Sequence, residues 1–323
     1  MSGTAHREVD VLVVGAGPAG LAAATAAARR GRKVVVLDDN PGAGGQIWRV
    51  GLKSAQQPGS REMRVRAKAM AAFEASGAML LPGRRVVDAR EPGTLQALAG
   101  EHMESFRWER LILATGARER LLPFPGWTLP GVYGAGGLQA LVKGGFSIRS
   151  KRVVVAGTGP LLLAVAAHLH EDGATIVAVA EQASLRQMLP FAASLWKRPE
   201  KLLQGAGYKR MLGSTPYRTG CWIVSAQGED HVQSVTLTDG RRKWTIACDA
   251  VACGFHLMAN IELAQSLGCS VTDGLVDVNE RQGTSVEGVY CAGEPTGIAG
   301  VDAALVQGEI AGLAAAGVSD LPA

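Results

Sequence analysis

The stretch VDVLVVGAGPAGLAAATAAARRGRKVVVLDD, residues 9–39, decides how the fold begins. Its apolar run at 9–14 indicates a buried parallel strand, and the alanine-rich run after the glycines indicates a helix ending near Arg30. A second apolar run at 33–38 indicates the next strand. Strand, glycine turn, helix and strand in this order predict a βαβ unit of a parallel sheet.

The glycine turn in this stretch has the spacing of a dinucleotide-binding loop. Gly15 allows the tight turn, Gly17 lets a pyrophosphate approach the backbone, and Gly20 lets helix and strand pack closely. The N-terminus of the following helix supplies N–H groups and the positive end of its dipole to the phosphates. Asp38 ends the second strand at the distance expected of a carboxylate that binds ribose hydroxyls. The expected ligand of this turn is therefore a dinucleotide.

The same pattern occurs a second time. A strand at 152–156, a turn at 157–160, a helix to about 172 and a strand at 174–180 predict another βαβ unit. Short apolar runs alternate with turn signals over 205–247, which is typical of a small antiparallel sheet.

Two more strands, at 249–254 and 288–294, precede a helix that starts near Val301. We predict an α/β protein with two Rossmann-like (three-layer ββα) dinucleotide-binding domains, the second inserted in the first. The expected FAD-binding domain comprises 1–120 and 249–323, and the expected NAD(P)-binding-like domain comprises 121–248.

The composition suits two packed cores, because 47% of the 323 residues are hydrophobic and 42 are glycine. The net charge of +4 is mild, so we interpret the basic clusters at 29–33 and 64–68 as a helix end and a solvated helix face. No nucleic-acid partner is expected.

The sequence shows neither a clear membrane span nor a signal peptide. The apolar runs around 11–28 and 153–169 contain glycine and proline, which favours strand–turn–helix units over membrane spans. The first ten residues lack the order of a signal peptide. The five cysteines are dispersed, with no Cys-x-x-Cys, so neither a redox disulfide nor an iron–sulfur cluster is predicted. We expect a cytoplasmic protein without a metal site.

Three later segments favour FAD as the dinucleotide of the first turn. GGQIW (44–48) follows the acidic strand end closely, and ILATG (112–116) is a strand that ends against the nucleotide. GVYCAGE (288–294) places Glu294 at a strand end, where it can hydrogen-bond the ribitol hydroxyls. The helix that follows can direct its positive end at the flavin pyrimidine, where charge accumulates on reduction.

These segments, in this order, resemble the two-dinucleotide-binding-domain flavoproteins, the superfamily of glutathione and thioredoxin reductases. The resemblance covers nearly the whole chain, and it implies a set of FAD contacts. The expected FAD residues are Gly15, Gly17, Pro18, Ala19, Gly20, Asp38, Asp39, Gly45, Gln46, Thr115, Gly116, Gly293, Glu294 and Val301. Disulfide reductases of this group need a cysteine pair beside the flavin, and the absence of one here makes disulfide reduction an unexpected activity.

A narrower resemblance rests on four stretches: DDNPGAGGQIWR (38–49), GARERLLPFPGWTLPGVYGAGGLQALVK (116–143), VVVAGTGPLLLAVA (153–166) and GEPTGIAGVDAALVQGEIAG (293–312). Together they resemble the FAD-binding alpha-type subunit of multi-subunit amine and amino-acid dehydrogenases. That family includes opine oxidases, hydrogen cyanide synthase and (hydroxy)proline dehydrogenase complexes, and it is similar to part of the large subunit of sarcosine oxidase.

The narrower resemblance implies a division of labour. A separate FAD-containing catalytic subunit oxidises the C–N bond of the substrate, and a small [2Fe–2S] subunit takes part in the electron relay. Many alpha-type subunits carry a C-terminal cysteine-rich cluster domain. This sequence has none before Ala323, so the cluster is expected on another chain or beyond a truncated end.

The second glycine turn, GTGPLLL (157–163), keeps Gly157 and Gly159 but has Leu162 at the third glycine position. Leu162 is expected to push the helix away from its strand. Glu181 ends the next strand, where a carboxylate pairs with ribose hydroxyls and repels a 2′-phosphate. The expected ligand, if this turn binds one, is NAD or another adenine nucleotide rather than NADP.

Some residues stay open between a site and ordinary structure. Trp48 either flanks the flavin or packs at a domain boundary, and His256 either approaches the flavin or lies in a surface turn. No catalytic side chain is identified, since the flavin itself carries the electron transfer. Two alternatives to the dehydrogenase subunit remain, namely a stand-alone NADH-dependent flavoprotein reductase and a structural nucleotide-binding subunit.

Overall fold

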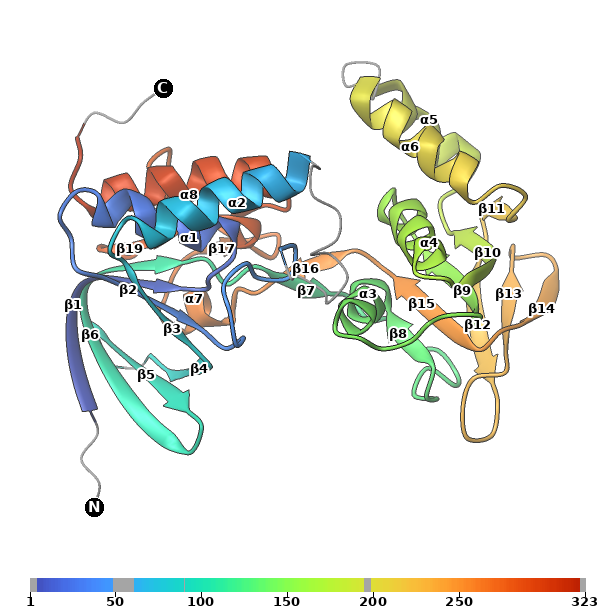
Figure 1. Cartoon of the computed structure of the whole chain (residues 1–323), viewed down its shortest axis with the longest axis horizontal. Coiled ribbons are helices and arrows are strands. Elements are labelled where there is room, and N and C mark those ends of the chain that lie inside the picture. Colours follow the sequence, from blue (N-terminus) through green and yellow to red (C-terminus); the bar gives the residue numbers. More distant parts are fainter. Residues whose placement is uncertain (1–4, 49–60, 90, 195–198, 320–323) are drawn as a thin grey trace. The chain divides into compact units, whose positions relative to one another are not determined.

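The computed structural model describes residues 5–48, 61–89, 91–194 and 199–319. These divide into two compact units (Figure 1). Unit 1 contains the described residues up to Arg118 and from Met258 onward, and unit 2 contains Glu119–Leu257. Unit 2 is therefore inserted within unit 1 along the chain.

The centre of unit 1 is a seven-stranded sheet in the order β3-β2-β1-β6-β5-β4, with β19 also paired to β6. The strands β3, β2, β1, β6 and β19 are parallel, whereas β5 and β4 run antiparallel to their neighbours. The strands are β1 (Ala5–Val14), β2 (Val34–Asp38), β3 (Met79–Pro82), β4 (Arg84–Asp88), β5 (Thr94–Ala99), β6 (His102–Leu113) and β19 (Val289–Cys291).

Helices cover one face of this sheet, and a shorter segment covers the other. The first face packs on α1 (Pro18–Ala28), α2 (Arg61–Glu74) and α8 (Val301–Ala315) (Figure 1). The opposite face packs on the segment with α7 (Glu262–Ser266), β17 (Val271–Thr272) and β18 (Leu275–Val276). Most of α1 is buried because it lies between the sheet and α8, which explains why its sequence is apolar all round.

Unit 2 is built around a five-stranded parallel sheet in the order β11-β10-β9-β15-β8. One face packs on α3 and α4, and the other packs on an antiparallel sheet of β12, β13 and β14. The elements are β8 (Val132–Gly134), α3 (Ala135–Lys143), β9 (Arg152–Gly157), α4 (Leu161–Glu171), β10 (Thr175–Glu181), α5 (Leu185–Ser194), α6 (Pro199–Met211), β11 (Tyr217–Thr219), β12 (Trp222–Gln227), β13 (Ser234–Thr238), β14 (Lys243–Ala247) and β15 (Ala250–Gly254). Two short strands, β7 (Ala117–Glu119) and β16 (Leu257–Ala259), pair with each other where the chain changes unit.

The structure corrects two expectations about unit 2. The strand at 249–254, expected in the first domain, is β15 and lies between β9 and β8, so the chain returns to unit 1 after Leu257 rather than at 249. It is buried along its whole length, as a strand inside a parallel sheet should be. The antiparallel sheet is present, but only over 222–247, because the start of the region 205–247 belongs to α6.

In both units the glycine turn lies where the strand order reverses. β1 has β2 on one side and β6 on the other, and β9 has β10 on one side and β15 on the other. The carboxyl ends of such neighbouring strands border the crevice in which open α/β sheets bind ligands. A ligand site is therefore expected at the residues that follow β1, β6, β9 and β15.

Candidate functional site

The turn between β1 and α1 depends on two of its glycines for packing. Gly15 has a φ of +106°, and a Cβ there would collide with the Ala114 carbonyl oxygen at the end of β6. A Cβ on Gly20 would collide with the Gly15 carbonyl oxygen. The close approach of α1 to the sheet is therefore possible only without these side chains.

The same turn presents several N–H groups without an acceptor. The N–H groups of Gly17, Ala19 and Gly20 make no hydrogen bond to any described residue, and Pro18 has none to offer. The first turn of α1 also has no acidic residue and no side-chain cap. Nothing described lies within 4 Å of a Cβ placed on Gly17, so there is free space at this position of the turn. An anion such as a diphosphate fits this helix N-terminus.

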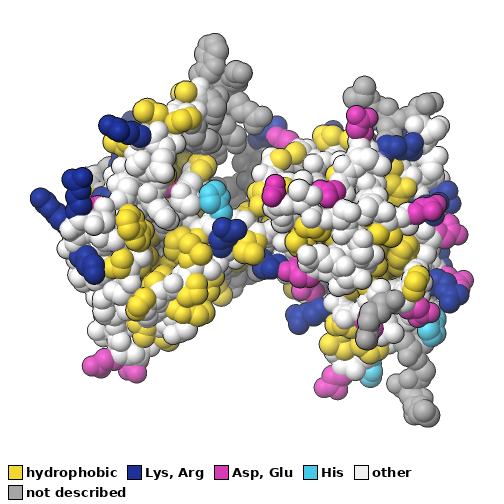
Figure 2. All heavy atoms as spheres, turned by 180° about the vertical axis from the view of Figure 1, so that it is seen from behind, with side chains coloured by type: hydrophobic (Ala, Val, Ile, Leu, Met, Phe, Trp, Pro, Cys, Tyr) yellow, Lys and Arg dark blue, Asp and Glu magenta, His cyan; other side chains and the backbone are white. Residues whose placement is uncertain are grey.

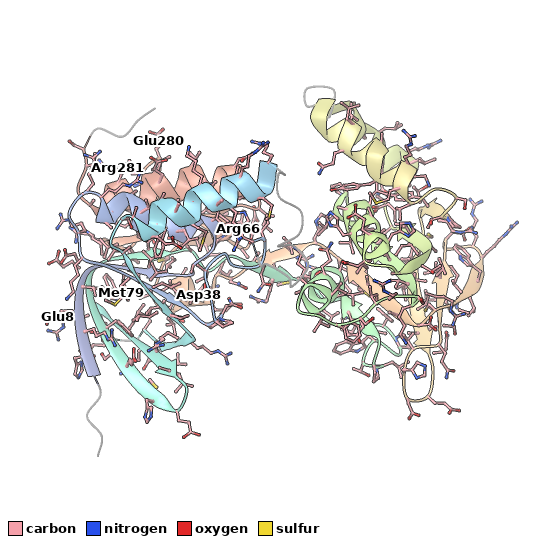
Figure 3. All side chains as sticks on the ribbon, viewed as in Figure 1. Glu8, Asp38, Arg66, Met79, Glu280 and Arg281 are labelled. Carbon is pink, nitrogen blue, oxygen red and sulfur yellow. The ribbon has the colours of Figure 1, made fainter. Side chains whose placement is uncertain are left out.

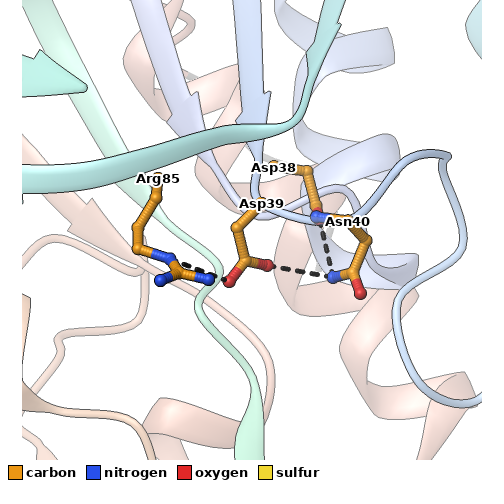
Figure 4. A network of polar contacts seen from close by, with 4 residues as sticks. All are labelled: Asp38, Asp39, Asn40 and Arg85. Carbon is orange, nitrogen blue, oxygen red and sulfur yellow. Dashed lines mark hydrogen bonds and ion pairs between the residues drawn. The ribbon is translucent and has the colours of Figure 1, made fainter. Parts of the chain in front are cut away.

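The acidic end of β2, where Figure 3 labels Asp38, is hydrogen-bonded to the turn. Asp38 is buried, and its carboxylate accepts the Ala16 N–H at 2.6 Å and both the backbone and side-chain N–H groups of Asn40 at 2.8 Å. Asp39 is half exposed and lies between Asn40 and Arg85, with its carboxylate 3.9 Å from the guanidinium (Figure 4). Asp38 thus holds the turn in place, and Asp39 presents the more accessible carboxylate.

The segment after β2 folds back over the turn. The Gly44 N–H donates to the Ala16 carbonyl oxygen at 2.8 Å, and a Cβ on Gly45 would lie 3.0 Å from the Gly17 Cα. Gln46 is exposed, whereas Trp48 is buried in the core of unit 1. The Trp48 indole N–H has no acceptor among the described residues. The sequence left the role of this tryptophan open, and the structure places its ring in the core.

The end of β6 is held by a residue that the sequence did not single out. Asn260 donates its backbone N–H to the Gly116 carbonyl oxygen and its side-chain N–H to the Thr115 carbonyl oxygen, both at 2.9 Å. The Thr115 hydroxyl donates to the Asn260 carbonyl oxygen at 2.7 Å, and Arg118 donates to the Asn260 side chain at 2.7 Å. Only the return of the chain into unit 1 brings Asn260 here, so no local motif could have identified it.

The C-terminal part of the chain completes the site. Glu294 is half-buried, and its carboxylate lies 3.6 Å from where a Gly116 Cβ would be. Burial raises the pKa of Glu294, while a hydrogen bond from the Ala117 N–H opposes this shift. The Gly293 N–H donates to the Gln307 side chain at 3.0 Å.

Close helix packing positions this end. Cβ atoms on Gly308 and Gly312 of α8 would collide with the Ala19 and Ala23 carbonyl oxygens of α1. The two glycines stand four residues apart, a spacing visible in the sequence that could have predicted a close helix pair. Val301 begins α8. The opening turn, the end of β6 and Glu294, which lie far apart in sequence, are thus neighbours in unit 1.

The corresponding turn of unit 2 differs in its hydrogen bonds. Gly159 donates its N–H to the Glu181 carboxylate at 2.9 Å, and Glu181 is buried. Gly157 has a φ of +150°, and a Cβ there would collide with the Gly254 carbonyl oxygen. Leu162 is fully buried, and it lies against Gly254 at the end of β15.

Other classes of site receive no support from the described part of the chain. It contains no group of three His, Cys, Asp or Glu side chains suited to a metal ion, and no helix long and apolar enough to cross a membrane. On the face shown in Figure 2, Lys and Arg side chains are scattered rather than gathered. The cluster at 29–33 follows the end of α1, and the one at 64–68 lies on α2, as expected.

Comparison with known proteins agrees with this architecture. The family model described as pyridine nucleotide-disulphide oxidoreductase matches residues 9–308. Hydrogen cyanide synthase subunit HcnB of Pseudomonas protegens is 34% identical over 94% of this chain and 70% of its own length. An opine oxidase subunit of Rhizobium meliloti is 33% identical over the same shares of the two chains.

A solved structure shows the same fold. Thioredoxin reductase of T. acidophilum superposes with a TM-score of 0.75 at 23% identity, over 97% of this chain and 99% of its own. At that identity the likeness concerns the α/β fold with two dinucleotide-binding-type units.

Proposed function

The chain belongs to the pyridine nucleotide–disulphide oxidoreductase family, and on that premise we propose that unit 1 binds FAD and serves in a multi-subunit amine or amino-acid dehydrogenase. The observation that carries the FAD site is the set of three N–H groups without an acceptor, on Gly17, Ala19 and Gly20, at an α-helix N-terminus open to a diphosphate. FAD bound there would supply electron acceptance and donation in one- or two-electron steps.

The residues around the turn would each hold a different part of FAD. The N–H groups at the start of α1 would bind the diphosphate, and Asp39 would accept hydrogen bonds from the ribose hydroxyls. Asp38 would hold the turn in place through its bonds from Ala16 and Asn40. Glu294, beside Gly116, would accept hydrogen bonds from the ribitol chain.

The other expected contacts would border the same cofactor. Gly45 and Gln46 would lie over the turn, Thr115 and Gly293 would line the ends of β6 and β19, and the N-terminus of α8 at Val301 would face the flavin pyrimidine. These positions all belong to unit 1.

The proposed role as one component of a complex rests on the relatives. The hydrogen cyanide synthase and opine oxidase relatives are both named as subunits. By analogy, an FAD-containing catalytic subunit would oxidise a CH–NH or CH–NH2 donor, and this chain and a small [2Fe–2S] protein would relay the electrons. The absence of any Cys-x-x-Cys in the sequence makes this role more suitable than disulfide reduction.

The FAD site is tested by Gly17→Asp. Gly17 has an extended backbone with φ −74° and free space above it, so an aspartate fits there without strain and caps α1. Its carboxylate would take the N–H groups and repel the diphosphate. We expect the purified wild-type chain to bind one FAD, and the Gly17→Asp chain to remain folded with FAD binding weakened at least 100-fold.

Gly17→Asn is the matched control, since it has the same size without the charge, and it should lose less affinity than Gly17→Asp. The measurement is flavin absorbance after dialysis, with circular dichroism to confirm folding. Unchanged FAD binding in Gly17→Asp would contradict the proposed site. The role in a complex is tested separately, by co-purification from the native host followed by amino-acid oxidation assays.

A further inference from the structure

The two glycine turns of this chain allow a comparison in which each serves as the control for the other. Along the sequence, Gly15-Ala-Gly-Pro-Ala-Gly20 corresponds to Gly157-Thr-Gly-Pro-Leu-Leu162. The family implies a pyridine nucleotide at the second turn. The hydrogen bonds of unit 2 show whether its residues fit one.

Most of the N–H groups that a phosphate would need at the second turn already have acceptors within unit 2. Thr158 donates to the Gly254 carbonyl oxygen at 2.8 Å, Gly159 to the Glu181 carboxylate at 2.9 Å, and Leu162 to the Gly159 carbonyl oxygen at 3.2 Å. Pro160 has no N–H. Of positions 158–162, only Leu161 keeps an N–H without an acceptor among the described residues, whereas the matching positions of the first turn keep three.

The carboxylate at the end of β10 is closed off from solvent. Glu181 is only 1% exposed, and it also accepts the Ala183 N–H at 2.9 Å. Burial, the charge of Glu181 and a hydrogen bond to that carboxylate raise the pKa of Tyr217 to about 12, so the Tyr217 hydroxyl stays protonated beside it. Glu181 therefore offers no accessible oxygen to a ribose hydroxyl.

The second turn has side-chain neighbours that the first turn lacks, while Pro160 and Leu161 remain exposed. A Cβ on Gly159 would lie 3.7 Å from the His256 imidazole, whereas a Cβ on Gly17 would meet nothing within 4 Å. Leu162 packs against Gly254, with its Cδ2 2.7 Å from where a Gly254 Cβ would be. In unit 1 a side chain on the strand, Ala114, faces a glycine on the helix, Gly20. In unit 2 the larger residue is on the helix, Leu162, and it faces a glycine on the strand, Gly254, so helix and sheet are in contact without a third glycine.

A second carboxylate occupies the neighbouring helix N-terminus. After β8, the sequence Gly134-Ala-Gly-Gly137 opens α3, and the N–H groups of Gly136 and Gly137 donate to the Glu119 carboxylate at 2.7 and 2.9 Å. Both glycine-rich turns at the carboxyl edge of the unit 2 sheet are thus already bonded to carboxylates of unit 2 itself. A diphosphate at either turn would meet the negative charge of the carboxylate that is already bonded there.

From these contacts we infer that unit 2 does not bind a pyridine dinucleotide, because the carboxylates of Glu181 and Glu119 already accept N–H groups of its two glycine turns. The residues of unit 2 do not fit the NAD(P) that the family implies. If the proposed function holds, the consequence is that electrons reach the flavin from a partner protein rather than from NAD(P)H bound to this chain. The closure itself does not depend on that function.

The inference is tested with the full chain by hydrogen exchange and calorimetry. In the chain without added nucleotide, amides in 157–162 should exchange at least tenfold more slowly than amides in 15–20. FAD should protect amides in 15–20 and leave those in 157–162 unchanged. With the FAD site filled, addition of 5 mM NADH, NADPH or ADP should leave exchange in 157–162 unchanged and give no binding heat. Anaerobic NADH should leave the flavin of the FAD-loaded chain oxidised over minutes.

A matched variant tests the role of the carboxylate. Glu181→Gln replaces one oxygen by a donor, so exchange at 157–162 should rise severalfold, while Gln182→Glu, an exposed neighbour, should leave it unchanged. Saturable binding of NADH or ADP that protects 157–162 in the wild-type chain would overturn the inference. Failure of FAD to bind would instead overturn the proposed function, and the exchange of 157–162 would still report on unit 2.

Discussion

At the scale of single residues, the middle glycine of the turn differs between the two units. Gly17 has an extended φ of −74° and an N–H without an acceptor, whereas Gly159 has a φ of +100° and an N–H bonded to Glu181. The acids after the second strands also differ. Asp38 and Glu181 are both buried, but Asp38 is followed by the half-exposed carboxylate of Asp39, whereas Glu181 is followed by Gln182. Function at this scale depends on which N–H groups remain unbonded.

Glu294 belongs to the same scale, and its titration can be measured. Burial raises the pKa of Glu294 above its ordinary value of 4.5, so the folded chain holds the proton more tightly than the unfolded chain. The stability of the FAD-free chain should therefore fall as the pH rises from 4.5 through the folded-state pKa. Glu294→Gln removes the free-energy cost of ionising this buried carboxyl group.

We expect Glu294→Gln to be more stable than the wild type at neutral pH and equal to it below about pH 4, where both side chains are neutral. FAD affinity should fall in the variant, because an acceptor for the ribitol hydroxyls is lost. Urea unfolding at several pH values and flavin titration are the measurements, with exposed Glu287→Gln as the control. Lower stability of Glu294→Gln at pH 7 would contradict the assignment.

At the scale of elements, the close packing of α8 on α1 forms the site. α8 follows Glu294 and begins at Val301, so its contact with α1 fixes how the C-terminal part approaches the first turn. The contact relies on Gly308 and Gly312, whose missing side chains let the helix backbones touch. In unit 2, α4 meets its sheet instead through Leu162 set against Gly254.

Gly312→Ala tests the helix contact. The added methyl would collide with the Ala23 carbonyl oxygen, and the resulting overpacking should cost about 1–3 kcal/mol of unfolding free energy. Over most of that range the cost exceeds the gain of about 1 kcal/mol that alanine brings to a helix interior. FAD affinity should fall as α8 shifts away.

The control is Gly207→Ala in α6, where a Cβ would meet nothing within 4 Å. The gain in helix propensity should act alone there and raise stability by up to about 1 kcal/mol. Chemical denaturation of both variants measures the difference. A stabilised Gly312→Ala would show that the two helices are not in close contact.

At the scale of the whole molecule, one chain contains two copies of a βαβ architecture, of which only unit 1 has an open turn. Unit 1 draws on both ends of the sequence, and unit 2 on the middle. Five buried cysteines are free, and burial raises the pKa of each thiol, so the described structure contains no reactive thiolate to pass electrons onward.

Ligand linkage gives a prediction for the two units together. FAD at 100 times its dissociation constant should stabilise the unit that binds it by about 2.7 kcal/mol. Exchange of core amides in β1 and α1 should slow accordingly, and exchange of core amides in β9 and α4 should not. Equal protection of both sets would indicate that FAD binds in unit 2 or that the units unfold together.

Much of the fold could be predicted because apolar periodicity and glycine spacing are local properties. The helices after Gly15 and Gly157 and the start of α8 at Val301 agree with the sequence analysis, whereas β1 begins four residues before the predicted strand, at Ala5. The place of β15 could not be predicted, since a short apolar strand is compatible with either sheet. Asn260 was also missed, because its partner Thr115 lies 145 residues away.

The sequence by itself determined the duplicated βαβ architecture, the insertion of one unit in the other and the family to which the chain belongs. Which turn is open was decided by the tertiary structure alone. Both turns have glycines, a helix and an acid at similar spacing, but hydrogen bonds from Gly159 to Glu181 and from Gly136 and Gly137 to Glu119 exist only in the folded chain. Binding an anion requires N–H groups without acceptors, and these can be identified only when the hydrogen bonds of the folded chain are known.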